Sequence, residues 1–291
     1  MSSLKRKVIF NSLWRSVGNI FLKFVAGFSS IVLAWFLVPE DYALVAMISV
    51  LIAFSSILVD SGLSQALIRK LKVYQTELNT VFYTNVGLSV ILYLTCYILA
   101  PLISEFYNEE RLIDIIRVVS ISFFFNALSV VPRTLLLRTF KFVHETAIVL
   151  SASILSSALA ILLAYLDYGV WALIFQILFN SIFLTLFYWI FGNWRPSFHF
   201  NFLDLKRLWV FSSFLSIDFL ISVPFENLYL IVLPKYFAAS LVGFYFFSHK
   251  ISQIFIQLMV NGVLTVSYPI LSKIQNNNLY LKKSYSKIIN V

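Results

Sequence analysis

The sequence predicts an all-α membrane protein with about eight transmembrane helices. Of its 291 residues, 60% are hydrophobic and only 12% are charged, whereas soluble domains average about 45–50% apolar and about 25% charged residues. The mean hydropathy is +0.88, and the apolar residues form long runs separated by short polar segments. A soluble fold of this size would have too few charges to cover so much apolar surface, so we expect the chain to cross a membrane several times.

Eight apolar runs are long enough to cross a bilayer, because about 20 helical residues span its hydrocarbon core. β-Barrel strands would be shorter and would alternate apolar with polar residues. The expected spans are residues 15–38, 42–62, 80–101, 113–131, 146–166, 170–191, 209–233 and 241–268. We expect residues 1–207 to form an N-terminal lobe of six helices, and residues 208–291 to begin a C-terminal lobe that is incomplete after two.

Basic residues lie mostly in alternate connections between these spans. With the N-terminus in the cytoplasm, sixteen Lys and Arg residues fall on the cytoplasmic side and only Arg111 and Lys235 fall outside. The sixteen are Lys5, Arg6, Lys7, Arg69, Lys70, Lys72, Arg133, Arg138, Lys141, Arg195, Lys206, Arg207, Lys273, Lys282, Lys283 and Lys287. This asymmetry predicts an even number of spans with both ends inside. Glu40 and Asp41, which follow Pro39, then mark an external turn.

The sequence carries no motif of an enzyme or of a cofactor site. It has no Walker loop, no G-x-S-x-G, and no His or Cys cluster with metal-ligand spacing. His144, His199 and His249 are isolated, and the lone cysteine, Cys96, lies in an apolar run. The net charge of +9 is spread over the connections, which favours a topology signal over a nucleic-acid surface. We therefore expect no enzyme activity, cofactor, metal or nucleic-acid partner.

Several basic residues lie inside the expected spans, where an ionisable side chain costs about 2.5–3.5 kcal/mol on insertion scales. Lys23 is in the first span, Arg117 in the fourth and Lys250 in the eighth. A cavity that gathered these cations would suit the phosphate or pyrophosphate head group of a substrate. The alternative for each, as for Arg15 at the start of the first span, is that the long side chain reaches the membrane interface.

Three acidic residues are candidates for binding a coupling ion or for pairing with a cation. Asp218 and Glu226 are eight residues apart in the seventh span, so they lie on similar faces of a helix, where the lysines of the first and eighth spans are possible partners. Asp60, at the end of the second span, can alternatively cap a helix. Pro224 predicts a kink in the seventh span, and interrupted helices often line transport sites.

Seven segments, in order along nearly the whole chain, carry a family resemblance. They are LVPEDYALVAM (37–47), DSGLSQALIRK (60–70), VPRTLLLRTFKF (131–142), GVWALIFQ (169–176), WRPSFHF (194–200), ENLYLIVLPKYFAASLVGFYFFSHKI (226–251) and YPILSKIQNN (268–277). Together they resemble the polysaccharide flippases, the O-antigen and exopolysaccharide branch of the multidrug/oligosaccharidyl-lipid/polysaccharide superfamily. One departure is Trp35, where relatives often carry an arginine.

The resemblance implies two helical lobes around a central cavity. It implies that a polyprenyl-pyrophosphate-linked oligosaccharide crosses the bacterial inner membrane by alternating access, for the synthesis of O-antigen, capsule or exopolysaccharide. Membrane lipids, a polysaccharide polymerase and export proteins are the implied partners. In related lipid flippases, basic residues of the first and eighth spans line the cavity, and Lys23 and Lys250 occupy comparable spans.

Three alternatives stay open at this stage. A drug or cation antiporter of the same superfamily would favour acidic over basic residues in its cavity, and both signs are present here. A membrane enzyme such as a polysaccharide polymerase or ligase would need a large external loop, which is not expected. A fragment that does not transport is the third, because the chain ends after eight expected spans.

Overall fold

A computed structural model describes the backbone of residues 2–274. Side chains are described except for residues 2–13, 15, 16, 215 and 258–274. The predictions for the cations outside this part of the chain, and for most of the segment 268–277, therefore lie outside the described residues. These cations are Lys5, Arg6, Lys7, Arg15, Lys273, Lys282, Lys283 and Lys287.

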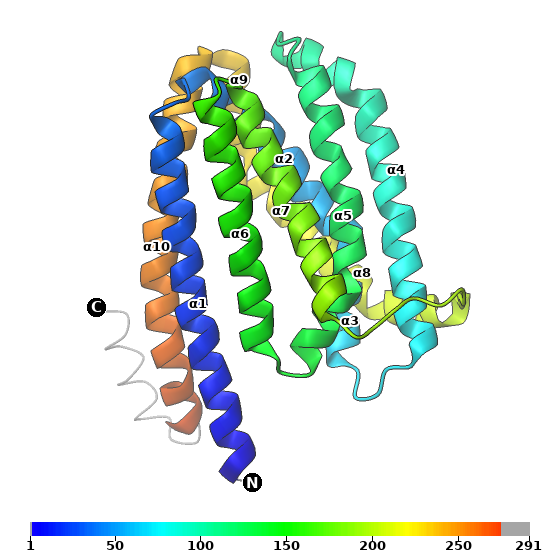
Figure 1. Cartoon of the computed structure of the whole chain (residues 1–291). Helices are drawn as coiled ribbons and strands as arrows, with labels where there is room; N and C mark the ends of the chain where they lie inside the picture. Colours follow the sequence, from blue (N-terminus) through cyan, green and yellow to red (C-terminus); the bar gives the residue numbers. More distant parts are fainter. Residues whose placement is uncertain (1, 275–291) are drawn as a thin grey trace.

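The described residues form ten α-helices and no strand (Figure 1). The helices are α1 (Ser2–Ala34), α2 (Pro39–Asp60), α3 (Leu63–Arg69), α4 (Gln75–Tyr107), α5 (Leu112–Arg138), α6 (Phe142–Tyr165), α7 (Val170–Phe191), α8 (Phe202–Glu226), α9 (Leu228–Tyr236) and α10 (Ala239–Ile274). Long α-helices satisfy every backbone hydrogen bond within the segment, which is what the hydrocarbon core of a bilayer requires. The all-α polytopic fold is confirmed.

Seven described segments are long and apolar enough to cross a membrane. Six correspond to the first six expected spans, and the seventh, Phe202–Tyr236, combines α8 and α9. The eighth expected span, 241–268, lies within α10, which is not among the seven. At 36 residues, α10 is about 54 Å long, which exceeds the thickness of a bilayer core, about 30 Å.

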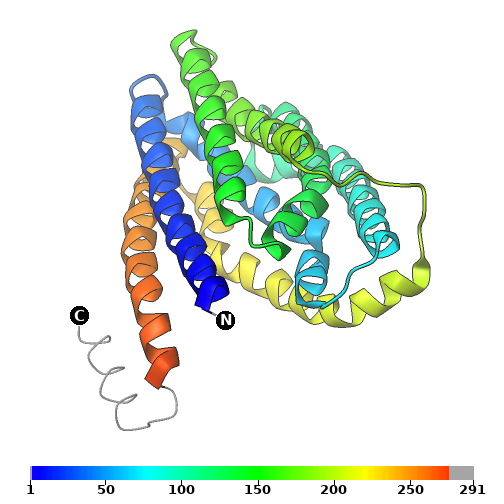
Figure 2. The ribbon, with the colours of Figure 1, turned by 60° about the horizontal axis from the view of Figure 1, so that its bottom comes forward.

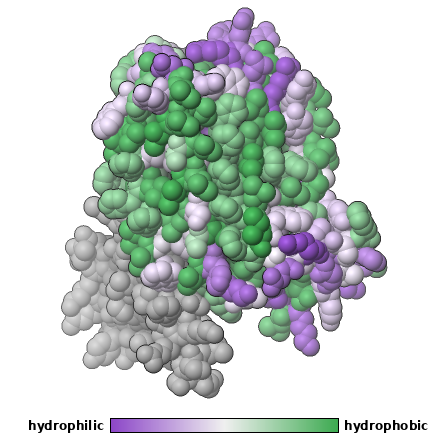
Figure 3. All heavy atoms as spheres, in the orientation of Figure 1, coloured by the Kyte–Doolittle hydropathy of each residue, from purple (hydrophilic) through white to green (hydrophobic). Residues whose placement is uncertain are grey.

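On the face shown in Figure 3, apolar residues cover the middle, and hydrophilic ones gather at the top and at the lower right. Phe24, Phe28 and Ile98 are each at least 66% exposed, while the polar Asn85 and Ser120 are fully buried. A soluble protein would show the reverse pattern. The exposed apolar side chains form the surface that lipid would cover, as expected of a multi-pass membrane protein.

The short helix α3 was not expected from the sequence. Ser61 and Gly62 have φ of 46° and 67°, and these left-handed conformations turn the chain sharply between α2 and α3. Asp60 accepts hydrogen bonds from the backbone N–H of Ser64, at 3.1 Å, and from its hydroxyl group. The Asp60 carboxylate therefore caps the first turn of α3.

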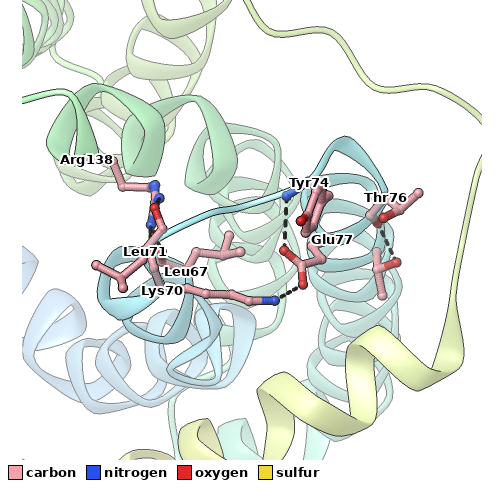
Figure 4. Close-up of polar contacts among 8 residues, drawn as sticks. Leu67, Lys70, Leu71, Tyr74, Thr76, Glu77 and Arg138 are labelled. Atoms are coloured by element: carbon pink, nitrogen blue, oxygen red, sulfur yellow. Dashed lines mark hydrogen bonds and ion pairs between the residues drawn. The ribbon is translucent and has the colours of Figure 1, made fainter.

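Two charged side chains hold the segment from α3 to the start of α4 (Figure 4). Arg138, the last residue of α5, donates to the carbonyl groups of Leu67 and Lys70, the latter at 2.7 Å. The Lys70 ammonium pairs with Glu77, whose carboxylate also accepts the Tyr74 N–H at 3.1 Å. The C-terminal carbonyls of α3 and the first turn of α4 are thus satisfied by side chains.

The seventh expected span is interrupted. The helix α8 runs through Pro224 and ends at Glu226, and α9 begins at Leu228. Asn227 forms the turn between them, and its side-chain amide donates to the Val223 carbonyl at 2.8 Å. The break therefore lies three residues beyond the proline that predicted a kink.

The helices that follow α7 pack on the helices that precede it. In Figure 1 and Figure 2, α10 lies beside α1, and it also packs along α2. The helix α8 crosses the end of the molecule that holds α3 and contacts α2, α3 and α4 (Figure 2). The division at residues 207 and 208 falls inside α8, so the two-lobe organisation stays a prediction.

An aromatic ladder runs along α7. Consecutive rings, spaced four residues apart, have centroids 5.7–6.3 Å from each other. The members are Trp171, Phe175, Phe179, Phe183, Phe187 and Phe191. Side chains at this spacing are neighbours on a helix surface, so each contact bridges one turn to the next.

Candidate substrate cavity

Polar side chains line one face of three neighbouring helices, because residues three or four positions apart share a face. On α1 the cavity-lining residues are Asn19, Leu22, Lys23, Ala26, Ser29 and Ser30. On α6 they are Glu145, Thr146, Val149, Ser153, Ser156 and Ser157. On α7 they are Gln176, Ile177, Asn180 and Ser181. The helix α1 packs on α6, and α6 on α7, so the three faces enclose a common space.

The outer part of this space is a cavity of about 490 Å³. It lies at the end of the molecule where α5 connects to α6, and Lys23, Arg133 and Glu145 line it. Arg133 Nε lies 3.5 Å from Glu145 Oε1, so one carboxylate balances one of the two cations. The outer cavity keeps a net positive charge, carried by Lys23.

The inner part is a cavity of about 330 Å³. It shares Ala26, Ser153 and Asn180 with the outer cavity, so the two are continuous. Lys250 of α10 is the cation among the described residues that line it, and the remaining polar lining consists of hydroxyl and amide groups. The combined space therefore passes from an entrance lined by charges of both signs to an interior in which hydroxyl and amide groups surround Lys250.

Hydrogen bonds between side chains fix the wall formed by α6 and α7. The Gln176 amide donates to the Ser157 hydroxyl at 3.1 Å, and the Asn180 amide donates to Ser156 at 3.3 Å. The hydroxyl of Ser156 in turn donates to the carbonyl of Ser153. Polar groups at membrane depth are costly unless they are paired or face water. These side chains are paired with each other, and they also line the cavity.

The structure brings together two of the three basic residues expected to bind substrate. Lys23 and Lys250, from α1 and α10, line the two continuous cavities. Arg117 lies elsewhere: its guanidinium carbon is 4.3 Å from the ring centroid of Tyr97 on α4. A role for Arg117 in binding substrate stays a prediction, since it lines neither cavity in this conformation.

The three candidate acids do not join these cations. Asp218 and Glu226 are exposed on α8, and no ion pair links either to Lys23 or Lys250 within the described part of the chain. Asp60 caps α3, as described above. The coupling-ion role proposed for these carboxylates stays a prediction.

The opposite end of the molecule is closed by contacts of α9 with α4 and of α10 with α2. The Lys235 ammonium donates to the Phe106 carbonyl at 2.5 Å, and the Tyr107 hydroxyl donates to Ile231 at 3.3 Å. Gly243 of α10 packs so closely on α2 that an added Cβ would lie 1.7 Å from the Pro39 carbonyl oxygen. The cavity therefore opens towards the end with the α5–α6 connection.

Both expected external cations lie at this closed end. Arg111 donates two hydrogen bonds, of 2.7 and 3.0 Å, to the Glu109 carboxylate. These hydrogen bonds lower the pKa of Glu109 below its ordinary value, although burial opposes them. At the closed end Arg111 is therefore paired with a carboxylate, whereas no ion pair is found for Lys23 or Lys250 within the described part of the chain.

Comparison with known proteins identifies the family. The family model of polysaccharide biosynthesis proteins matches residues 32–291. The chain belongs to this family. The match includes α2 to α10 and only the last three residues of α1, so it covers the cavity walls formed by α5, α6, α7 and α10 but not the cavity-lining residues of α1.

Three curated relatives carry names from polysaccharide synthesis. The lipopolysaccharide biosynthesis protein WzxC of Escherichia coli K12 is 25% identical over 99% of this chain and 59% of its own length. The teichuronic acid biosynthesis protein TuaB of Bacillus subtilis is 24% identical over 98% and 59%. The succinoglycan biosynthesis transport protein ExoT of Rhizobium meliloti is 22% identical over 89% and 52%. The chain thus spans little more than half the length of these relatives, and no solved structure matches it.

Sequence reasoning missed two charged residues of the cavity of this polysaccharide biosynthesis protein. Arg133 was assigned to a cytoplasmic connection because the fourth span was expected to end at residue 131, but α5 continues to Arg138. Glu145 lies in the first turn of α6, one residue before the expected fifth span. The expected end of the fourth span lies inside α5, and the expected start of the fifth span lies inside α6. Polar residues at the cavity entrance continue both helices, so the apolar runs are shorter than the helices.

Proposed function

We propose that this chain binds a polyprenyl-pyrophosphate-linked oligosaccharide and moves it from the cytoplasmic to the periplasmic leaflet of the inner membrane. The observation that carries the proposal is the cavity between α1, α6, α7 and α10, in a chain of the polysaccharide biosynthesis family. Cations at the entrance and interior of a membrane-embedded cavity match an anionic head group attached to a lipid. Polysaccharide polymerase and export proteins are the partners that follow from this role.

The charge of the cavity supports an anionic substrate. Lys23, Arg133 and Lys250 contribute three positive charges and Glu145 one negative charge, which leaves two positive charges in excess. A lysine ammonium attracts phosphate as a point charge, and an arginine can bind it through two parallel hydrogen bonds. A cation antiporter would need the opposite balance, and Glu145 is already paired with Arg133.

The open end of the cavity supports uptake from the cytoplasm. This end carries the connections that hold Arg69, Lys70 and Lys72, together with Lys141, and the positive-inside rule assigns such connections to the cytoplasm. The opposite end is closed by the contacts of Gly243 and Lys235. The conformation is that of a transporter open to the cytoplasm, where lipid-linked oligosaccharides would enter.

The test is to measure the binding of undecaprenyl pyrophosphate by the chain in lipid nanodiscs. We expect Lys23→Gln and Lys250→Gln each to weaken binding by about tenfold, because a charge-assisted hydrogen bond contributes about 1.5–3 kcal/mol. The same variants should lower transport in a bacterium that lacks its own polysaccharide flippase, without lowering membrane insertion.

Lys72→Gln is the matched control, because this lysine is exposed in the connection before α4 and does not line the cavity. It should bind and complement like the wild type. Unchanged binding and full complementation by both cavity variants would refute the proposed role of the two lysines.

A further inference from the structure

We propose that the inner cavity is a binding site for the uncharged, hydroxyl-rich sugar that follows the pyrophosphate. This inference rests on the proposed function and deepens it. It assigns two kinds of lining to two parts of the substrate. The cations Lys23 and Lys250 hold the pyrophosphate, and the amide and hydroxyl groups of the inner cavity hold the first sugar units.

The lining of the inner cavity has the hydrogen-bonding capacity that a sugar requires. Asn126, Gln176 and Asn180 each present a side-chain amide, which both donates and accepts hydrogen bonds. A sugar hydroxyl does the same, so amides can bind it in either direction.

The serines of the cavity complement these amides as acceptors. Ser29, Ser156 and Ser181 donate their hydroxyl hydrogens to carbonyl groups of their own helices, at 3.1, 3.1 and 3.2 Å. The oxygen lone pairs of Ser29 and Ser181 remain available to accept a hydrogen bond from a ligand, and Ser156, which already accepts from Asn180, keeps one. The helix backbone thereby orients these hydroxyls as acceptors for the O–H groups of a sugar.

Two lining side chains have no protein partner. Within the described part of the chain, no protein group forms a hydrogen bond with the side chains of Asn126 or Ser30, although both line the inner cavity. They come from α5 and α1, on different sides of the cavity. A polar group at membrane depth is costly unless water or a ligand satisfies it, and a bound sugar would satisfy both at once.

The spacing along α1 matches the order of groups in the substrate. Lys23 of the entrance and Ser30 of the interior are seven residues apart, which is about 10 Å along the helix axis. A pyrophosphate bound at Lys23 would therefore place its attached sugars beside Ser30. No carboxylate is among the described residues that line the inner cavity, so its chemistry does not select for positively charged amino sugars.

Two probes separate the sugar site from the pyrophosphate site. The chain in lipid nanodiscs is titrated with undecaprenyl pyrophosphate and, separately, with undecaprenyl-pyrophosphoryl-N-acetylglucosamine. We expect Asn126→Leu and Ser30→Ala each to weaken binding of the sugar-bearing probe by about fivefold, the effect of losing a neutral hydrogen bond. Binding of the sugar-free probe should stay within about twofold of wild type. Lys23→Gln should weaken binding of both probes.

The sugar-free probe also controls for folding, because a misfolded variant would lose it. Thr95→Val is a matched control that replaces an exposed hydroxyl on α4, and it should bind both probes like the wild type. If both inner-cavity variants bind the sugar-bearing probe like the wild type, the sugar site is refuted while the proposed function stands. If the wild type binds neither probe, the proposed function itself fails.

Discussion

Gly243 shows how one residue controls the packing of two helices. Its position on α10 faces the first residue of α2, and the Pro39 carbonyl occupies the space of an absent side chain. The backbones of α10 and α2 approach closely at this point, at the closed end of the cavity. A residue with a Cβ atom would push the helices apart.

Replacement of Gly243 by alanine should therefore destabilise the protein, by about 1–3 kcal/mol, the usual cost of overpacking. Gly87→Ala is the matched control, because no atom lies within 4 Å of the added Cβ. It should be neutral or stabilising by up to about 1 kcal/mol, since alanine favours a helix. Thermal unfolding in detergent compares the two, and equal melting temperatures would contradict the close packing.

The cavity residues differ in how well the sequence predicts them. Lys23 and Lys250 can be recognised in the sequence, because a charged side chain within an apolar run costs free energy in the membrane and therefore indicates a functional site. Asn126, Ser30 and Ser153 do not, because hydroxyl and amide groups are common in membrane helices, where they also bond to the backbone or to other helices. Their significance follows only from the packing that turns the polar faces of several helices towards one space.

Among the elements, α3 depends most on charged side chains of its neighbours. It has only seven residues, too few for a helix to be stable alone. The Asp60 carboxylate caps one end, and the Arg138 guanidinium binds carbonyl groups at the other. A hydropathy pattern finds long apolar helices well, as the match of the sixth span to α7 shows, but it does not reveal a short helix fixed by distant side chains.

Arg138→Ala should loosen α3 without unfolding the transmembrane helices. The lost hydrogen bonds to the Leu67 and Lys70 carbonyls should cost about 1–3 kcal/mol. Hydrogen–deuterium exchange should accelerate over residues 63–72 and stay unchanged in α7. Lys72→Ala removes an exposed cation nearby and should have no such effect. Equal exchange in both variants would show that Arg138 does not hold α3.

Across the whole molecule, the basic connections predicted from the sequence and the ends of the helices in the fold show the same alternation. The connections expected to face the cytoplasm lie at the end of the structure with the N-terminus, where the cavity opens (Figure 1). The connection between α6 and α7 lies at the other end. The chain order of the spans alone predicts this alternation, whereas the cavity required three-dimensional packing that no periodicity encodes.

Cysteine labelling can test the orientation, since Cys96 is the single cysteine and is buried. In a Cys96→Ala background, a membrane-impermeant maleimide should label Asp167→Cys in intact cells. It should label Lys72→Cys only after the cells are permeabilised, because positive-inside loops face the cytoplasm. The reverse pattern would invert the topology and the proposed direction of uptake.

The aromatic ladder of α7 has a mechanical consequence. When a helix bends, successive turns on the outer side of the bend move apart. Contacts between rings on successive turns oppose that separation. Each contact is worth about 0.2–0.5 kcal/mol, and α7 contains no proline, unlike α4, α5, α8 and α9. In the proposed transport cycle we expect α7 to move as a stiff rod, while the deformation concentrates at hinges such as Asn227. The wall that carries Gln176 and Asn180 would then keep its shape while the opening of the cavity moves from one side of the membrane to the other.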